Sequence, residues 1–96
     1  MAKPFVIIDL DKPRKLRYGI NQIIILEELI GKSLSEMDLS KLSFKDLRSM
    51  IYAGLSWEDK EITPELVGDL IDEYSNIEEV SKKMTEAFEA SFGEKK

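Results

Sequence analysis

The sequence predicts a mainly α-helical protein, a single domain over residues 1–96 built as a small helical bundle of about four helices with a short N-terminal β-hairpin. Three observations predict this fold class. Residues 5–18 carry the β-branched and alternating patterns that are typical of strands. Residues 20–92 carry apolar side chains at helical spacing, divided by glycine, proline and capping residues. The composition, 43% hydrophobic and 34% charged, is that of a folded chain with one modest core.

Residues 5–18 are expected to form the hairpin. Its first strand is Phe5–Leu10 (FVIIDL), which is rich in β-branched residues. The turn is predicted over Asp11–Arg14, where Pro13 fixes the backbone angle φ. The second strand is Lys15–Tyr18, where polar and apolar residues alternate. Because two strands alone are marginal in water, the hairpin must pack against helices or pair its edge with another chain.

The stretch Ile20–Gly31 (INQIIILEELIG) has two interpretations. Its three consecutive isoleucines suit a buried strand, whereas its apolar positions as a whole follow the helical period. Glu27 and Glu28 interrupt any alternation, and Gly31 stands where a helix C-cap is expected. We therefore predict a helix over residues 20–30. It is apolar around most of its girth, so it either lies centrally in the bundle or is covered by a partner.

A second helix is predicted from Phe44 to about Gly54, after a loop or single turn over residues 32–37. Ser43, followed by Asp46 at the third helical position, is a variant of the capping box. The apolar residues that follow share one stripe, the pattern of a helix with one face in the core.

Two further helices complete the predicted bundle. Thr63 followed by Pro64 is a strong helix start, and Asn76 has the form of another cap. Gly68 lies inside the third helix, where a glycine costs about 1 kcal/mol relative to alanine, and a close contact between helices would explain it. Residues 93–96 are expected to be a frayed tail.

The residue types present offer little chemistry. The chain has no cysteine and no histidine, which excludes disulfides and thiolate metal sites and removes the commonest general base and zinc ligand. Asp69 and Asp72 share a helix face, but no second acidic face with matching spacing completes a magnesium site. The sequence therefore predicts no catalytic, cofactor-binding or metal-binding residue and no enzyme activity. A hydrolase is the third and least supported alternative.

The charge is acidic overall and unevenly spread, with a net value of −5 at pH 7. Residues 61–96 carry ten acidic and four basic side chains, so this third of the chain repels phosphates and no nucleic acid partner is expected. The basic side chains between residues 12 and 17 are interpreted as a solvated turn and strand face. No apolar run approaches the ~20 residues of a membrane span, and the N-terminus makes a poor signal peptide. We therefore expect a cytoplasmic protein without a membrane partner.

Protein binding is the function class that remains. Tyrosine and tryptophan are enriched in interface hot spots, which makes Tyr52 and Trp57 candidates for partner contact. The candidate protein-binding residues are Ile25, Leu29, Tyr52, Trp57, Phe88 and Phe92. Structural alternatives stay open for several of them. Tyr52 suits a core-edge aromatic residue, the last two phenylalanines suit a docked core edge, and Trp57 lies between charges and is expected to be partly exposed.

Three motifs follow one another along the chain. They are Leu26–Ser33 (LEELIGKS), Ser43–Leu55 (SFKDLRSMIYAGL) and Glu61–Asp72 (EITPELVGDLID). Together they resemble the tail assembly chaperones of long-tailed bacteriophages, in particular the small family that is also found in gene transfer agents. The resemblance covers about residues 15–75, and Ile62 stands where leucine is common in that family. The motifs are packing and capping signatures, so the family transfers no catalytic residue.

The resemblance implies a non-enzymatic assembly factor of a phage or prophage. Its implied clients are the long helical tape measure protein, which it would coat, and the tail-tube protein, whose subunits then polymerise around the tape measure. The implied chaperone forms a homo-oligomer in the bacterial cytoplasm and is absent from the finished tail. We expect the first helix to supply part of the self-association surface. The alternative, favoured by the acidic last third, is a small acidic regulator that binds another protein or mimics nucleic acid.

Overall fold

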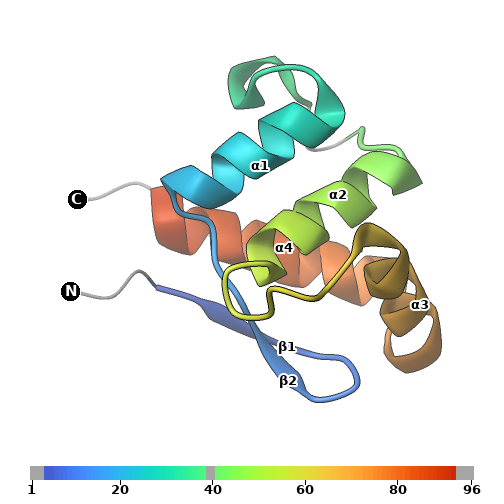
Figure 1. Ribbon diagram of the computed structural model, residues 1–96. Coiled ribbons are helices and arrows are strands. Elements are labelled where there is room, and N and C mark those ends of the chain that lie inside the picture. The colour runs from blue at the N-terminus through green and yellow to red at the C-terminus, as the bar shows by residue number, and fades with distance from the viewer. Residues whose placement is uncertain (1–3, 39–40, 93–96) are drawn as a thin grey trace.

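The chain folds as the predicted hairpin followed by helices (Figure 1). The structure is a computed structural model that describes residues 4–38 and 41–92. In chain order its elements are β1 (Val6–Asp9), β2 (Pro13–Leu16), α1 (Ile20–Ile30), the short 3-10 turn η1 (Leu34–Glu36), α2 (Phe44–Leu55), α3 (Pro64–Tyr74) and α4 (Ile77–Phe92). The predicted fold class is confirmed. The tail predicted over residues 93–96 lies outside the described residues.

The hairpin exists but its second strand is shifted from the predicted position. β1 and β2 pair antiparallel, with Asp9 opposite Pro13. Pro13 therefore begins β2 instead of lying in the turn, and the first residue of a strand is a position where proline is tolerated. The strand ends at Leu16, because the backbone beyond it bonds to a helix: the Arg17 N–H donates to the carbonyl oxygen of Gly54 at 3.0 Å.

The ambiguous stretch INQIIILEELIG is helix α1, as the spacing predicts. Its start is fixed by Gln22, whose side-chain oxygen accepts a hydrogen bond from the Gly19 N–H at 2.9 Å. Its end is fixed by Gly31, which has a φ of 89° in the left-handed region that favours glycine. Both ends are thus determined by short-range chemistry, which outweighs the strand preference of three isoleucines.

The predicted caps also fix the starts of the later helices. Ser43, Thr63 and Asn76 each accept, through a side-chain oxygen, the backbone N–H three residues further on, at 3.0, 3.1 and 2.8 Å. Each bond satisfies a donor that has no partner within its helix. The three helix boundaries predicted from capping residues are therefore confirmed.

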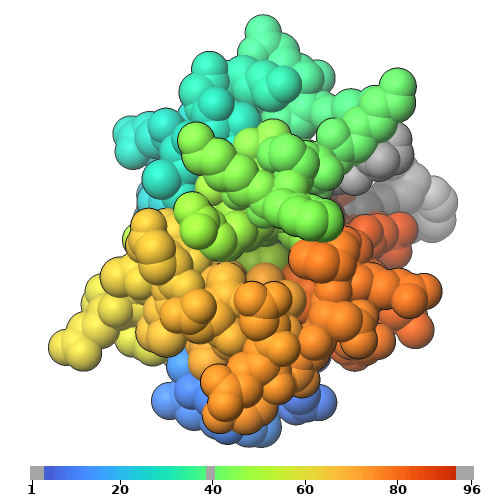
Figure 2. Space-filling model, turned by 90° about the vertical axis from the view of Figure 1, so that its right-hand side faces the viewer, coloured from blue at the N-terminus to red at the C-terminus, as the bar shows by residue number. Residues whose placement is uncertain are grey.

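Helix α2 is the central element of the fold. It packs against α1, α3, α4 and β2, and α4 covers β1 (Figure 1). When the molecule is turned by 90°, the first half of α2, helix α3 and the start of α4 meet on one face (Figure 2). The hairpin lies beside the far end of α2, where Gly54 makes room for it. A Cβ at Gly54 would lie 2.5 Å from Cδ1 of Leu16 and 2.9 Å from Cζ of Tyr18.

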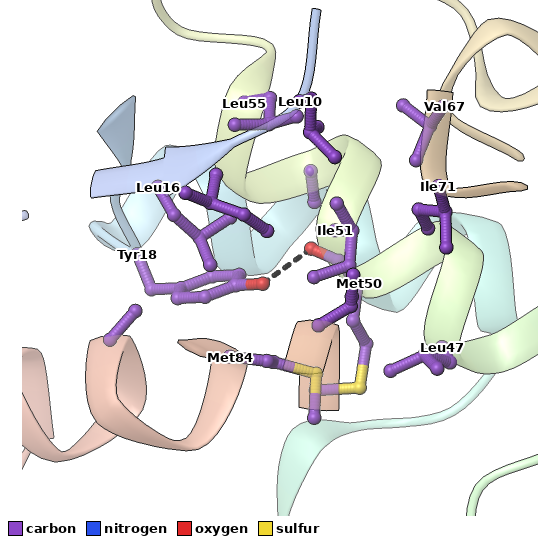
Figure 3. Packing of buried hydrophobic residues seen from close by; sticks show 14 of the residues in the cluster. Leu10, Leu16, Tyr18, Leu47, Met50, Ile51, Leu55, Val67, Ile71 and Met84 are labelled. Carbon is purple, nitrogen blue, oxygen red and sulfur yellow. Dashed lines mark hydrogen bonds between the residues drawn. The ribbon is translucent and has the colours of Figure 1, made fainter. Parts of the chain in front are cut away.

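Tyr18 joins the hairpin, α2 and α4 at the middle of the core (Figure 3). Its hydroxyl donates a hydrogen bond to the Met50 carbonyl oxygen at 2.6 Å. Its ring stacks on Phe88 of α4 with 4.2 Å between the ring centroids. Complete burial raises the pKa of Tyr18, so the phenol stays protonated and remains a donor.

Candidate protein-binding surfaces

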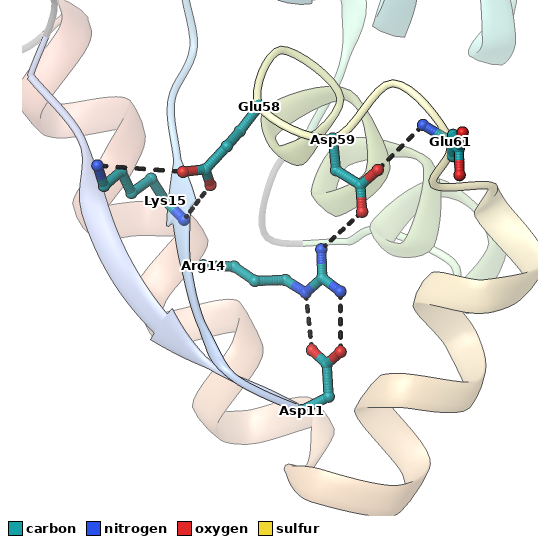
Figure 4. A network of polar contacts seen from close by, with 6 residues as sticks. All are labelled: Asp11, Arg14, Lys15, Glu58, Asp59 and Glu61. Atoms are coloured by element: carbon teal, nitrogen blue, oxygen red, sulfur yellow. Dashed lines mark hydrogen bonds and ion pairs between the residues drawn. The ribbon is translucent and has the colours of Figure 1, made fainter.

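A buried arginine fastens the hairpin to the connection between α2 and α3 (Figure 4). Arg14 donates to both carboxylate oxygens of Asp11, at 2.8 and 2.9 Å, and to Asp59 at 3.1 Å. We call these three residues the hairpin ion network. The hydrogen bond with Arg14 lowers the pKa of Asp11. The pKa of Asp59 is lowered mainly by the hydrogen bond from the Glu61 backbone N–H and also by the bond from Arg14. The expectation that this arginine lies on a solvated face is therefore wrong, because Arg14 is buried and bonds both to nearby Asp11 and to Asp59, which is distant in the sequence.

Trp57 serves the same attachment. Its indole N–H donates to the Lys15 carbonyl oxygen at 3.0 Å, and the guanidinium of Arg17 lies 3.9 Å from the centroid of its ring. The Lys15 backbone N–H also donates a hydrogen bond to Oε1 of Glu58 at 3.3 Å. Trp57 is partly exposed, as predicted, but much of its surface is used within the chain to hold the strand against the end of α2.

Three of the candidate residues lie together. Ile25 of α1, Tyr52 of α2 and Trp57 line one hollow of about 370 Å³ between the two helices and the connection. All three are partly buried, and the first two pack against the core. Arg17 and Lys60 also line this hollow, so its wall is mixed rather than apolar. It is a recess of mixed polarity with two aromatic side chains, Tyr52 and Trp57, in its wall.

The two candidates on α4 differ from each other. Phe88 is buried in the core against Tyr18, which agrees with the docked core edge left open by the sequence. Phe92 lies 5.9 Å from Phe88 between ring centroids and is 46% exposed. Only the last aromatic residue of α4 therefore presents a large surface to solvent.

Helix α1 lies at the edge of the bundle and buries one face. Its fully buried residues are Gln22 and Leu26, which face α2. Ile20, Ile24 and Leu29 are exposed by 69%, 46% and 42%. Of the two predicted positions for this helix, the central one is therefore wrong, and its outer apolar face remains uncovered by the described part of the chain.

A second apolar surface was not predicted from the sequence. Two adjoining hollows, of about 410 and 150 Å³, run between α2 and α3 and between α2 and α4. Phe44, Leu47 and Ile77 line both hollows, so we treat them as one groove and call it the α2–α3–α4 groove. It lies on the face shown in Figure 2. Phe44 is 75% exposed at its mouth.

The described residues contain no group of three or more acidic, histidine or cysteine side chains placed to hold a metal ion. Asp69 and Asp72, the carboxylates considered from the sequence, both line the α2–α3–α4 groove. None of the helices in the described ranges is long and apolar enough to span a membrane. The features with a functional implication are thus the uncovered face of α1 and the groove.

Comparisons of the chain with protein-family models, with curated proteins and with solved structures find no match. The resemblance to phage tail assembly chaperones therefore stays a prediction that rests on the three motifs.

Proposed function

We propose that this chain is a non-enzymatic tail assembly chaperone of a long-tailed phage or prophage. In this proposal it acts in the bacterial cytoplasm, binds the tape measure protein as a homo-oligomer and helps recruit tail-tube subunits. The observation that carries the protein-binding part is the outer face of α1, where Ile20 and Ile24 stand one turn apart in solvent. The choice of the tape measure and tail-tube proteins as clients rests on the motifs that resemble the chaperone family.

The physical properties of the chain suit that role. Exposed aliphatic side chains on a helix cover apolar stripes of other helices, which is how an aggregation-prone helical client is shielded. The net charge of −5 keeps a protein with such surfaces soluble. Many copies along one long client would give avidity from individually weak contacts.

The test is co-expression with the long helical protein encoded just downstream, followed by size-exclusion chromatography with light scattering. The proposal expects a complex that keeps the client soluble, and its mass gives the number of copies per client. A chain that elutes alone while the client aggregates would overturn the proposal. Gene order is a second test, because a chaperone gene is expected between the tail-tube and tape-measure genes.

The contribution of α1 is tested with the double variant Ile20→Ser/Ile24→Ser. It removes the two most exposed aliphatic side chains of the helix without adding charge, and the core contacts of Leu26 are left in place. A loss of oligomeric mass or of client binding is expected. Ile25→Asp is a less specific probe, because Ile25 packs against the core and its substitution also destabilises the fold.

The second candidate function is a small acidic regulator that binds another protein or mimics nucleic acid. The acidic character of residues 61–96, which includes the exposed carboxylates of α3, favours it. Its test is binding to a nucleic-acid-binding protein in competition with DNA, measured beside binding to tape measure segments. Competition with DNA and no tape measure binding would replace the first proposal by this one.

A further inference from the structure

The α2–α3–α4 groove combines an apolar floor with an acidic rim. Leu47 and Ile71 contribute to the floor, and Phe44 and Ile77 stand exposed at its edge. Its larger part, about 410 Å³, falls in the size range of roughly 300–1,000 Å³ that is typical of binding clefts, and the smaller part of about 150 Å³ extends it. A whole helix, about 10–12 Å across with its side chains, does not fit inside, so a helical occupant would lie on the groove with one apolar stripe inserted.

The rim carries three exposed carboxylates on one helix. They are Glu65, Asp69 and Asp72 of α3, and none of them forms an ion pair within residues 4–38 and 41–92. The spacing of three and four residues places them along one face of the helix, parallel to the groove. A row of unpaired carboxylates beside an apolar floor favours an occupant whose apolar stripe is flanked by lysine or arginine.

Arg48 adds a separate observation at the same place. It lines the groove from α2, and its Nε is buried without a hydrogen-bond partner. A buried donor without an acceptor is uncommon in native proteins, and an occupant that supplies one oxygen atom would satisfy it. The groove thus has both a buried donor without an acceptor and exposed apolar side chains that nothing in the described chain covers.

We propose that the α2–α3–α4 groove binds a basic amphipathic helix of a partner protein, with apolar side chains between Phe44 and Ile77 and lysine or arginine against Asp69 and Asp72. This inference deepens the proposed function, on which it rests, by stating the chemistry of the client segment. A second copy of this acidic chain is a poor occupant, because like charges would face each other across the rim. Nucleic acid is excluded by the same carboxylates.

The probe is an amphipathic peptide of about 18 residues built from leucine, alanine and lysine, long enough to become helical on binding. Its control is the twin peptide with glutamate at every lysine position. Fluorescence anisotropy is expected to give about tenfold or more tighter binding for the lysine peptide. Amide chemical shift changes are expected to concentrate around Leu47, Gly68 and Ile77. Equal binding of both peptides, or shift changes centred on α1, would overturn the proposal.

Variants separate the groove from the general acidity of the chain. Asp69→Lys/Asp72→Lys is expected to weaken binding of the lysine peptide about tenfold. The matched control, Glu28→Lys/Glu89→Lys, changes the net charge equally at exposed positions on α1 and α4 and is expected to change binding less than about twofold. Equal weakening by both variants would mean general charge attraction and would contradict the assigned site.

The apolar floor is tested in the same way. Phe44→Ser removes the exposed aromatic edge of the groove and is expected to weaken binding about tenfold. Tyr74→Ser removes an exposed aromatic residue of α3 that does not line the groove, and no change is expected. Both wild-type residues lie largely in solvent, so the folded state of each variant is retained and is checked by its circular dichroism melt.

Co-expression with the downstream client distinguishes the failure of this inference from the failure of the proposed function. If the rim variant Asp69→Lys/Asp72→Lys still keeps the client soluble, the chaperone function stands and the groove is not its client site. If the wild-type chain binds the lysine peptide in the groove but never binds the client, the groove stands and the chaperone function falls. Loss of client solubility with the rim variant alone supports both.

Discussion

Gly54→Ala is expected to destabilise the fold, although alanine is the better helix former. Gly54 is buried in the last turn of α2, where Leu16 and Tyr18 pack against it. The added methyl group would lie 2.5 Å from Cδ1 of Leu16 and 2.9 and 3.0 Å from Cζ and Oη of Tyr18. Neither side chain can easily move away, because both are fully buried and the tyrosine hydroxyl is bonded to Met50.

The magnitude follows from two opposing terms. Inserting a methyl group into a packed core costs about 1–3 kcal/mol, since the neighbours leave their preferred rotamers or the backbone shifts. The change from glycine to alanine inside a helix returns about 0.5–1 kcal/mol. The two ranges give a net loss of up to about 2.5 kcal/mol of unfolding free energy, with a centre at about 1 kcal/mol. For a chain of this length each kcal/mol corresponds to a Tm lowered by roughly 4–8 °C.

The matched control is Gly68→Ala in α3. A Cβ there would meet only Cδ of the Arg48 side chain, at 3.4 Å, and that side chain is flexible. The same substitution is therefore expected to raise the unfolding free energy, by about 0.5–1 kcal/mol. Urea unfolding followed by Trp57 fluorescence and by far-ultraviolet circular dichroism measures both variants. A Gly54→Ala protein stabilised as much as the Gly68→Ala protein would refute the close packing of the hairpin on α2.

Three further predictions concern the core and the hairpin. Tyr18→Phe is expected to lower the unfolding free energy by about 0.5–1.5 kcal/mol, because the bond to the Met50 carbonyl is lost, and urea titration checks it. Phe88→Ala is expected to cost about 3–5 kcal/mol and Phe92→Ala less than about 1.5 kcal/mol; equal costs would contradict their different burial. Asp11→Asn is expected to lower stability at pH 7. Because the folded-state pKa of Asp11 lies below the ordinary value of 3.8, its contribution is complete above that pH and is lost as the pH falls through the folded pKa. The difference from the wild type should therefore shrink below about pH 4 in unfolding titrations, and a constant difference would exclude the ion pair as its cause.

The helices could be predicted from the sequence because their ends are encoded locally. Ser43, Thr63 and Asn76 cap the residues directly after them, and Gly31 ends α1 by its own φ value. The hairpin could be predicted as an element, but its exact strands could not. The position of β2 depends on the bond from Arg17 to α2, a contact between residues far apart in the sequence.

The two glycines inside helices show the same limit. Gly68 stands out in the sequence because it lies in the middle of a helix, yet among the described residues a Cβ there would meet only the flexible side chain of Arg48. In the sequence Gly54 marks the end of a helix, and in the fold it is the position where the hairpin touches α2. The sequence of one helix shows where a glycine lowers helix stability. Only the tertiary packing shows which neighbouring group comes too close for a larger side chain.

The candidate site was hidden for a related reason. Phe44 and Ile77 are the first residues of α2 and α4, so both continue the apolar stripes of their helices and look like core residues in the sequence. An apolar stripe shows which face of a helix packs against the core. It does not show how much of the helix length the neighbouring elements cover. In the fold α3 packs along α2 but leaves Phe44 and Ile77 exposed. The starts of α2 and α4 therefore meet beside the acidic side chains of α3. A surface that forms where the ends of several helices meet leaves no pattern in the sequence of any one helix. It can therefore be recognised only in the structure, where its charge and shape indicate which occupant it fits.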